Sequence, residues 1–330
     1  MDKMNIVFLD AETVGSDVNF ELFEQLGNFT AYENTSRGDV ISRLQNVDIV
    51  IVNKTKITKE IIDACPQLKL ICVAATGTNN IDLEYAGEKG ITVKNVAGYS
   101  TDSVVQITYG LLLTLMNRVP YFDNYVKSGC YSQNRFFTHY GRTFYELASK
   151  QVGIIGMGTI GKQSAKVAEA FGAIIAYYST SGKNNSVSYK RLELDELLKT
   201  SDIVLIHAPL NEHTRNLINS DKLKLMKPSA FIVNTGRGGI INEEDLVNAI
   251  DNGTIMGAGL DVFSHEPLNS DNPLLKVKKK EHLVLAPHIG WASVEARHRL
   301  LEGIAQNIKA FLLYYLLFFF YFPHQNNTLT

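Results

Sequence analysis

The chain has 330 residues, of which 45% are apolar and 20% charged, and its formal net charge is −2. This length and composition are typical of a folded protein of two domains, and the near-neutral charge, without a basic stripe, argues against a nucleic-acid-binding protein. Its three cysteines are scattered and form no CxxC pair, which favours reduced thiols and a cytoplasmic location.

The first hundred residues alternate short apolar runs with amphipathic stretches. Strands are predicted at 5–10, 47–53, 68–76 and 91–96, and helices within "NFELFEQLG", "SRLQN" and "TKEIIDAC". The first apolar run is too short for a signal peptide and predicts a strand. Strand–helix alternation predicts a parallel sheet covered by helices on its faces.

A long helix is predicted after "NVAGYSTDS", where Ser100 or Thr101 can cap its first turn. Its sequence, "VVQITYGLLLTLMNR", is apolar on most sides. A helix of this kind is usually packed between other elements. We therefore expect it to lie between domains or between subunits.

A second alternating run begins at Gln151. Six parallel strands are predicted, at 152–156, 173–178, 202–208, 230–235, 257–263 and 283–287. Six strands with intervening helices are the size of a complete Rossmann domain.

An amphipathic helix follows Pro287, within "HIGWASVEARHRLLEGIAQNIKAFL", and we expect it to cross back to the first domain. The predicted fold is therefore α/β, with two Rossmann-like, doubly wound domains. The nucleotide domain, 100–288, would be inserted into a discontinuous flavodoxin-like substrate domain made of 1–99 and 289–330. Such a chain would carry its chemistry in the cleft between the domains.

The segment 310–322, "AFLLYYLLFFFYF", is a continuous apolar run rich in aromatic residues. It is shorter than the about 20 residues that span a bilayer, so no membrane association is expected. A buried or partner-covered end, a tail translated in a shifted reading frame and a membrane anchor remain the alternatives, in that order.

A G-x-G-x-x-G pattern follows the strand 152–156 and opens a helix, which is the context that gives this pattern meaning. Its first glycine makes a tight turn, its second lets the backbone approach a pyrophosphate, and its third lets the helix pack on the strand. The helix amino terminus then attracts the phosphates. The predicted dinucleotide-binding residues of this loop are Gly156, Met157, Gly158, Thr159, Ile160 and Gly161.

A chain that binds NAD usually carries an acid about twenty residues later, on the ribose hydroxyls. Here the segment is "YYSTSGK", with Ser179 and Thr180 at that place and Lys183 just beyond. Hydroxyls do not repel a 2′-phosphate, so strict exclusion of NADP is not expected. The cofactor is predicted to be NAD or NADP, and no metal site is predicted.

Three polar residues follow strands of the second domain: Arg237 in "VNTGRGG", Glu266 in "LDVFSHEP" and His288 in "APHIGW". Ligands of open α/β sheets collect beyond the carboxyl ends of the strands, so the three can meet. Histidine is suited to deliver a proton to a carbonyl, and a carboxylate beside it favours the imidazolium. Arginine can hold the carboxylate of a 2-oxo acid.

The chain resembles the D-isomer-specific 2-hydroxyacid dehydrogenases, and most closely their glycerate dehydrogenase (hydroxypyruvate reductase) branch. The resemblance runs from about Lys54 to Ala310 and includes "NKTKIT", "AATGTNNID", "NVAGYSTDSVVQ", "NTGRGGIINEEDL", "GLDVFSHEPL" and "PHIGWASVEARHRL". Gly236 and Gly290 stand where the family usually has alanine, which loosens two loops but removes no functional group.

The resemblance implies that Arg237 binds the substrate, that Glu266 pairs with His288, and that His288 is the acid and base. It also implies a homodimer, to which the long helix from about Thr101 would contribute. Further cofactor-binding residues that it implies are His207, Pro209, Thr214, Thr235, Gly236, Arg237, Asp261, His288 and Gly290. Substrate-binding residues that it implies are Lys54, Thr76, Gly77, Thr78, Arg237 and His288.

The resulting hypothesis is hydride transfer between a nicotinamide cofactor and a small D-2-hydroxy acid, with glycerate/hydroxypyruvate favoured and glyoxylate as a further substrate. A D-lactate or other D-2-hydroxyacid dehydrogenase is the enzymatic alternative. A dinucleotide-sensing protein similar to a corepressor is the non-enzymatic alternative, and turnover of an oxo acid distinguishes it.

Overall fold

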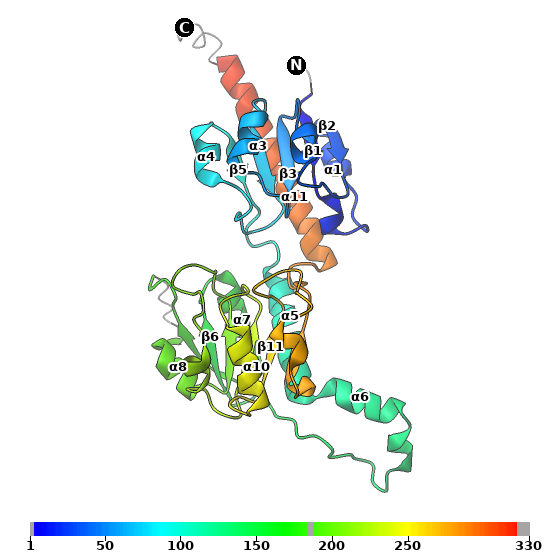
Figure 1. Ribbon diagram of the computed structural model, residues 1–330, viewed down its shortest axis with the longest axis vertical. Helices are drawn as coiled ribbons and strands as arrows, with labels where there is room; N and C mark the ends of the chain where they lie inside the picture. The colour runs from blue at the N-terminus through cyan, green and yellow to red at the C-terminus, as the bar shows by residue number, and fades with distance from the viewer. Residues whose placement is uncertain (1–2, 184–187, 322–330) are drawn as a thin grey trace. The chain divides into compact units, whose positions relative to one another are not determined.

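The computed structural model describes residues 3–183 and 188–321, which form two compact units. Unit 1 consists of Met1–Ser100 and Ala292–Thr330, and unit 2 of Thr101–Trp291. The chain therefore leaves unit 1, builds the whole of unit 2 and returns to unit 1 with one helix (Figure 1). The boundaries of the two units lie at 100/101 and 291/292.

Unit 1 is a five-stranded parallel sheet in the order β2-β1-β3-β4-β5, the flavodoxin-like order. Its elements are β1 (Asn5–Phe8), η1 (Ala11–Val14), α1 (Glu21–Glu24), β2 (Asn28–Ala31), α2 (Val40–Arg43), β3 (Ile49–Val52), α3 (Lys59–Ala64), β4 (Leu70–Val73), α4 (Leu83–Glu88), β5 (Thr92–Lys94) and α11 (Val294–Tyr321).

The central strands of unit 1 are buried on both faces, because alternate side chains enter two hydrophobic layers. Val50 and Val52 of β3 pack in the layer that contains side chains of α2, α3 and α4. On the other side, α11 packs against β4, and α1 against α11. Cys72 of β4 is fully buried, as its position in an apolar run predicts.

Unit 2 is a seven-stranded parallel sheet in the order β12-β11-β10-β9-β6-β7-β8, the classical Rossmann order with one further strand. Its elements are α5 (Thr101–Asn117), α6 (Val119–Lys127), η2 (Cys130–Gln133), β6 (Gln151–Ile155), α7 (Thr159–Ala170), β7 (Ile174–Tyr178), β8 (Lys190–Arg191), α8 (Leu194–Thr200), β9 (Ile203–Ile206), α9 (Ser220–Leu223), β10 (Phe231–Asn234), α10 (Glu243–Asp251), β11 (Gly257–Leu260), η3 (Pro273–Lys276), η4 (Lys280–His282) and β12 (Leu283–Leu285).

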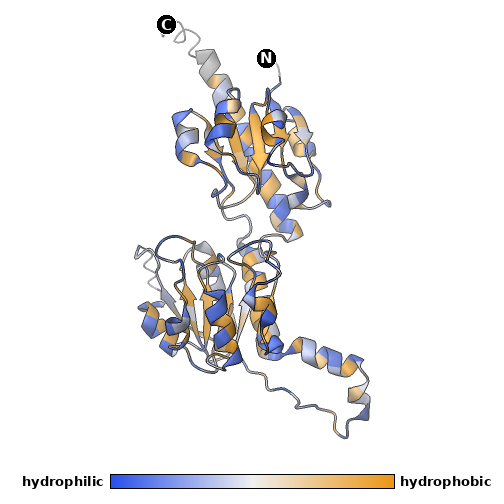
Figure 2. Ribbon diagram, viewed as in Figure 1, coloured by the Kyte–Doolittle hydropathy of each residue, from blue (hydrophilic) through white to orange (hydrophobic). Residues whose placement is uncertain are grey.

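The sheet of unit 2 also separates two hydrophobic layers. Ile203 and Leu205 of β9 pack with α5 and α7, whereas Val204 and Ile206 pack with α8 and α10. Figure 2 shows the result, with hydrophobic strands inside each unit and hydrophilic residues on the outer surfaces of its helices. The predicted α/β class with two Rossmann-like sheets is confirmed.

Two strands were not predicted. β2 has the sequence "NFTA" and is mostly exposed at the edge of its sheet, so it lacks the apolar run that marks a buried strand. β8 has only two residues, both exposed. The helices α1 and α2 each have four residues, fewer than the amphipathic stretches around them suggest.

The long helix α5 uses its apolar surface mainly within unit 2. It contacts α7 and the strands β10, β11 and β12, and nine of its residues are buried. Intradomain packing therefore accounts for most of its apolar character. The next segment, α6 with the chain up to residue 146, extends away from the rest of unit 2 (Figure 1); we call residues 119–146 the arm.

The apolar run at the C-terminus continues α11 as far as Tyr321, and Phe322 lies outside the described residues. Leu313, Tyr314 and Leu317 are exposed on this helix rather than buried. None of the helices in the described part of the chain combines the length and apolarity of a membrane span.

Candidate active site

The glycine loop joins β6 to α7 at the carboxyl edge of the unit 2 sheet. Gly156 has φ +97°, and a Cβ there would lie 2.8 Å from the His207 carbonyl oxygen, so only glycine fits the turn. A Cβ on Gly161 would lie 2.2 Å from the Gly156 oxygen, so helix and strand can approach only with glycine. A Cβ on Gly158 would meet no atom within 4 Å. The backbone there faces open space at a helix amino terminus, which fits a dinucleotide pyrophosphate.

The remaining residues of the glycine loop are either buried against the sheet or exposed to solvent. Met157 is fully buried in the layer beneath α7, and Ile160 packs against the same layer. Gly158 and Thr159 are exposed at the start of the helix. Met157 and Ile160 thus anchor the loop, and Gly158 and Thr159 present it to solvent.

His207 follows β9, which lies beside β6, where the strand order reverses. Its Nε2 lies 2.9 Å from Ser164 Oγ of α7, and its Nδ1 lies 3.4 Å from Thr235 Oγ1. Thr235 in turn lies 2.8 Å from the Thr108 hydroxyl. Burial lowers the pKa of His207 to about 4. The imidazole is therefore neutral near pH 7. Through its two ring nitrogens it links the loop after β9 to α7 and to the loop after β10.

The lowered pKa of the buried His207 predicts that the free energy of unfolding decreases in acid. His207 has a folded-state pKa of about 4, below the about 6.5 of an unfolded chain, so the unfolded state binds the proton first as the pH falls. The contribution of His207 to the free energy of unfolding should be fully present above pH 7 and be lost as the pH falls from 6.5 to 4, by on the order of 1–3 kcal/mol. His207→Gln should remove this part of the decline.

Urea titrations at pH 7 and pH 5, followed by the fluorescence of Trp291 in unit 2, measure this difference. His213→Gln is the matched control because His213 is exposed in the same unit. A wild type and a His207→Gln variant with the same pH dependence would contradict the prediction.

His288 and Glu266 are in direct contact. His288 Nδ1 lies 2.6 Å from Glu266 Oε2, and Glu266 Oε1 accepts the Phe263 N–H at 2.9 Å. Both side chains are about 30% exposed, at 28% and 31%. The carboxylate is thus anchored on its own loop and orients the imidazole, with Nε2 as the ring nitrogen that points away from it.

The backbone of His288 is in the left-handed region, with φ 55°. Such a conformation is uncommon for a residue with a side chain and is frequent at functional sites. The Asp261 carboxylate supports it, because Oδ1 and Oδ2 accept the N–H groups of Ile289 and Gly290 at 2.8 and 2.7 Å. A Cβ on Gly290 would lie 2.7 Å from Asp261 Oδ2, so glycine permits this close approach.

Asp261 is nearly completely buried. Burial raises its pKa, and the two backbone N–H groups counteract this effect. Both oxygens already hold the loop that carries His288. Asp261 therefore positions the loop that carries His288.

Arg237 lies on the loop after β10 and is exposed. Its Nη1 donates to the Gly236 carbonyl at 2.8 Å, and its own carbonyl accepts from Asn234 Nδ2 at 2.8 Å. Asn234 Oδ1 also accepts the Gly236 N–H at 3.0 Å. The buried Asn234 side chain therefore fixes the loop from which Arg237 projects.

Thr214 is completely buried, and its hydroxyl is used within the turn 209–214. It donates to the Pro209 carbonyl at 2.6 Å and accepts the Asn211 N–H at 2.8 Å. Pro209 is exposed at the start of this turn. Thr214 thus shapes the turn that presents Pro209 and does not offer its hydroxyl to solvent.

In unit 1, Lys54 follows β3 at the point where the strand order reverses between β1 and β3. Asp10, which follows β1, is buried and holds this loop. Its Oδ1 accepts the Asn53 N–H at 2.8 Å, and its Oδ2 accepts the N–H groups of Lys54 and Thr55 at 2.6 and 2.7 Å. The Lys54 side chain is exposed.

Thr76, Gly77 and Thr78 form the loop after β4, beside the Lys54 loop in the same unit. Asn80 joins the two loops, because its Nδ2 donates to the Thr55 carbonyl at 2.9 Å. Thr76 Oγ1 donates to the Val96 carbonyl at 3.1 Å, and Gly77 and Thr78 are half-buried. The predicted substrate residues of unit 1 therefore lie together at the carboxyl edge of its sheet.

Sequence reasoning did not single out Asp10 or Asn234 as residues that position the site. Both lie at the carboxyl ends of predicted apolar strands, in "NIVFLD" and "FIVN". A short polar side chain at the carboxyl end of a buried parallel strand was the available signal. Which loop it holds depends on neighbouring strands far away in the sequence.

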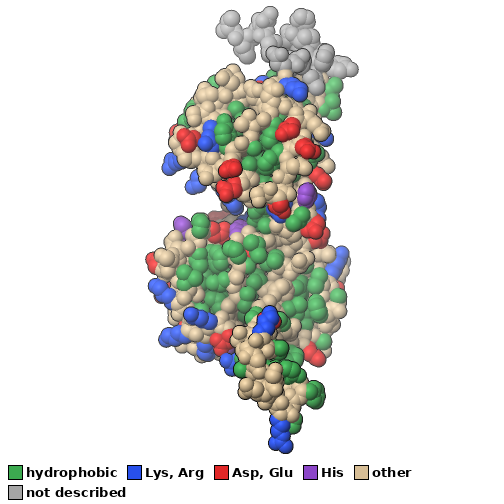
Figure 3. All heavy atoms as spheres, turned by 90° about the vertical axis from the view of Figure 1, so that its right-hand side faces the viewer, with side chains coloured by type: hydrophobic (Ala, Val, Ile, Leu, Met, Phe, Trp, Pro, Cys, Tyr) green, Lys and Arg blue, Asp and Glu red, His purple; other side chains and the backbone are tan. Residues whose placement is uncertain are grey.

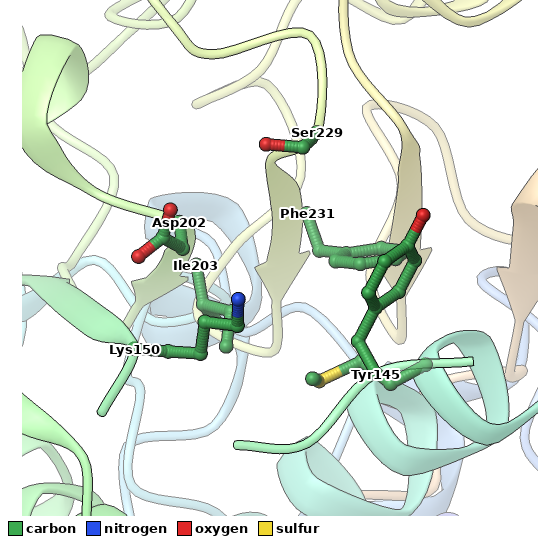
Figure 4. Close-up of a pocket in the computed structure, with 7 residues that line it drawn as sticks. Tyr145, Lys150, Asp202, Ile203, Ser229 and Phe231 are labelled. Atoms are coloured by element: carbon green, nitrogen blue, oxygen red, sulfur yellow. The ribbon is translucent and has the colours of Figure 1, made fainter. Parts of the chain in front are cut away.

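A small pocket lies at the opposite, amino edge of the unit 2 sheet (Figure 4). Its cavity is about 50 Å³ and is lined by Tyr145, Lys150, Asp202 and Phe231 among others. Asp202 accepts the Gln151 N–H at 2.9 Å and pairs with Lys227 at 2.8 Å. These contacts hold the beginnings of β6 and β9, and the pocket lies at the edge away from His288.

A Rossmann sheet with an open glycine loop and an imidazole–carboxylate pair at its carboxyl edge is typical of a dinucleotide-dependent oxidoreductase. Residues 109–290 match the family model described as the D-isomer specific 2-hydroxyacid dehydrogenase, NAD binding domain. The chain belongs to the D-isomer-specific 2-hydroxyacid dehydrogenase family, and its cofactor is NAD or NADP.

Two curated relatives cover nearly the whole chain. A hydroxypyruvate reductase of Blautia hydrogenotrophica is 38% identical and covers 94% of this chain and 97% of its own. A glycerate dehydrogenase of Methylorubrum extorquens is 35% identical and covers 93% of this chain and 96% of its own.

A solved structure with the same fold is the NADPH-dependent glyoxylate/hydroxypyruvate reductase of Sinorhizobium meliloti in complex with NADP and malonate. Its TM-score is 0.79 at 27% identity, and the match covers 94% of this chain and 95% of that one.

Proposed function

We propose that this protein interconverts hydroxypyruvate and D-glycerate with a nicotinamide cofactor, and that it also accepts glyoxylate. The observation that carries the proposal is the hydrogen bond between His288 Nδ1 and Glu266 Oε2, 2.6 Å long, at the carboxyl edge of the Rossmann sheet. The relatives named hydroxypyruvate reductase, glycerate dehydrogenase and glyoxylate reductase support this substrate class over D-lactate and over a non-enzymatic role.

His288 is the proton donor in the reducing direction. The imidazolium donates its Nε2 proton to the carbonyl oxygen of the oxo acid, which becomes the hydroxyl of the product. Glu266 accepts from Nδ1 throughout, so it stabilises the imidazolium and keeps Nε2 directed at the substrate. In the oxidising direction the neutral Nε2 removes the same proton.

The bound cofactor supplies or accepts the hydride. The glycine loop Gly156–Gly161 would hold its pyrophosphate, with Ser179 and Thr180 at the adenosine ribose. His207, Pro209, Thr235, Gly236 and Gly290 would line the rest of its site, and Thr214 and Asp261 would hold the turns that carry them.

Arg237 binds the substrate carboxylate and polarises the carbonyl that accepts the hydride. Lys54 and the backbone of Thr76, Gly77 and Thr78 would be the substrate-binding groups of unit 1. The Asp10 and Asn80 contacts support this role because they hold both loops in place.

Steady-state rates with a panel of 2-oxo acids test the substrate assignment. Hydroxypyruvate and glyoxylate should have the highest kcat/KM, and pyruvate and longer 2-oxo acids should be poorer. A clear preference for pyruvate would assign the chain to D-lactate instead, and an absence of turnover with every oxo acid would favour the non-enzymatic alternative.

We also propose a homodimer that is formed through the arm, residues 119–146. The side chains of Phe137 and Tyr140 are 90% and 88% exposed, and Phe136 and Phe144 are exposed too. Figure 3 views this side of unit 2, and hydrophobic side chains gather on its surface above the arm. A large exposed apolar surface of this kind is usually covered by a partner, and a second copy offers the same surface in return.

Light scattering at micromolar concentration should give twice the mass of the chain for the wild type. The double substitution Phe137→Glu and Tyr140→Glu should shift the mass to that of the monomer, because charges would be buried at the interface. Leu275→Glu, at an exposed apolar residue outside the arm, should leave the dimer intact. A monomeric wild type would contradict the proposal.

A cytoplasmic location is proposed as well. All three cysteines are free, with Cys65 and Cys72 buried. Unpaired cysteines are usual in a reducing compartment.

A further inference from the structure

The loop that carries Glu266 is bonded to a second carboxylate, that of Glu243. Glu266 Oε1 accepts the Phe263 N–H at 2.9 Å, and Glu243 Oε1 accepts the next backbone N–H, that of Ser264, at 2.6 Å. Glu243 is the first residue of α10. Hydrogen bonds from N–H groups to a carboxylate are charge-assisted and stronger than bonds between neutral groups. The loop after β11 is thus joined to the first turn of α10.

The other oxygen of Glu243 holds the far end of the same segment. Asn272 Nδ2 donates to Glu243 Oε2 at 2.7 Å. Asn272 is only 9% exposed, and its Oδ1 accepts the Leu274 N–H at 2.9 Å where η3 begins. The amide cannot turn over without losing that contact, so it presents its donor to Glu243. Because a glutamine has one acceptor oxygen, only a carboxylate of this length accepts from both donors.

The loop that carries Arg237 lies against the same backbone. A Cβ on Gly238 would lie 1.8 Å from the Phe263 carbonyl oxygen and 2.6 Å from the Ser264 nitrogen, so only glycine allows this contact. Gly238 directly follows Arg237. The peptide between Phe263 and Ser264 is therefore in contact with one loop of the site and bonded to α10. A shift of this peptide would displace Glu266, two residues further on.

We infer that Glu243 is a positioning residue for proton transfer. It holds the segment 263–272 so that Glu266 Oε2 faces His288 Nδ1, the 2.6 Å contact of the site. This inference rests on the proposed function in taking His288 as the proton donor. Glu243 acts through Glu266, which is the group in contact with the imidazole.

Glu243→Gln keeps the shape of the side chain but makes its NH₂ group face the N–H of Ser264 or the Nδ2 of Asn272, a donor against a donor. We expect kcat for hydroxypyruvate reduction to fall about 10- to 100-fold, the range for a reacting group displaced by up to about 1 Å. Cofactor affinity should not change, because the glycine loop is not part of this contact. Steady-state kinetics and a fluorescence titration of the cofactor measure both.

Glu244→Gln is the matched control. Glu244 is exposed in the same first turn of α10, so both substitutions remove an equal charge from the positive end of the helix dipole. The control should have the kcat of the wild type. An equal loss in both variants would assign the effect to the helix and overturn the inference.

A double-mutant cycle distinguishes positioning from a general loss of structure. If Glu243 acts through Glu266, Glu243→Gln should have little further effect on kcat in a Glu266→Gln background. The same fold-loss in both backgrounds would contradict the inference. Glu243→Ala leaves room for water in place of the carboxylate, and it serves as the second variant if Glu243→Gln does not fold. It should show the same dependence on Glu266, and an unchanged kcat would overturn the inference.

Crystal structures of the wild type and of the Glu243 variant separate this inference from the proposed function, because they need no turnover. The distance from His288 Nδ1 to Glu266 Oε2 should be near 2.6 Å in the wild type and beyond hydrogen-bond reach, above about 3.5 Å, in the variant. An unchanged contact in the variant would refute the role of Glu243 and leave the proposed function intact. A lengthened contact, with a wild type that reduces no oxo acid, would support the role of Glu243 toward Glu266 and refute the proposed function.

Discussion

His288→Ala is expected to lower kcat for oxo-acid reduction by on the order of 10²–10⁴, the usual contribution of a positioned acid. The variant keeps the glycine loop and Arg237, so cofactor affinity and the melting temperature should change little. Steady-state kinetics with saturating cofactor, together with a fluorescence titration of the cofactor, measure both. Near-normal turnover of the variant would show that another group donates the proton.

A substitution at Glu266, the hydrogen-bond partner of His288, tests the same assignment independently. Glu266→Gln keeps the shape of the side chain but removes the negative charge that faces Nδ1. The carboxylate that orients the imidazole through Nδ1 is then lost, so kcat for oxo-acid reduction should fall while cofactor affinity stays unchanged. His213→Ala, at an exposed histidine of the same unit, is the control for both variants and should behave as the wild type.

Arg237→Lys is expected to lower kcat/KM for the oxo acid by roughly 10²-fold or more, because a point charge cannot replace a bidentate fork on a carboxylate. The Asn234 contacts that hold this loop involve the Arg237 backbone, so the loop should persist in the variant. The loss should therefore appear in substrate binding and catalysis, with the cofactor dissociation constant unchanged.

Arg215→Lys, at an exposed arginine of the same unit, should have no such effect. Lost cofactor affinity with an unchanged KM for the oxo acid would assign Arg237 to the cofactor instead. The two measurements thus separate a substrate role from a cofactor role at a residue expected to lie near both.

The sequence predicted best those features that depend on neighbours along the chain. The glycine loop could be placed because a strand and a helix flank it. Gly156 has the positive φ of the tight turn, and a Cβ at Gly161 would prevent the close approach of helix and strand. The contact of Glu266 with His288 could be expected because both follow parallel strands, and such ends lie on one edge of the sheet.

Features that depend on side-chain partners could not be predicted. Periodicity indicates that a residue is buried, but not which hydrogen bond it makes. The resemblance implied that Thr214 and Asp261 bind the cofactor, but the sequence did not indicate that the Thr214 hydroxyl bonds within a turn or that the two oxygens of Asp261 hold the His288 loop. The apolar surface of α5 suggested an interface, but its own unit covers most of it, and a group of exposed aromatic residues lies on the arm instead.

The most direct test of the account is the oxidation of D- and L-glycerate by the wild type, followed by the appearance of reduced cofactor with NAD and with NADP. We expect oxidation of D-glycerate with a kcat/KM at least about 100-fold above that of L-glycerate, because the L-enantiomer misplaces a group that a polar site must bind. Preference for L-glycerate, or no oxidation of either enantiomer, would contradict it.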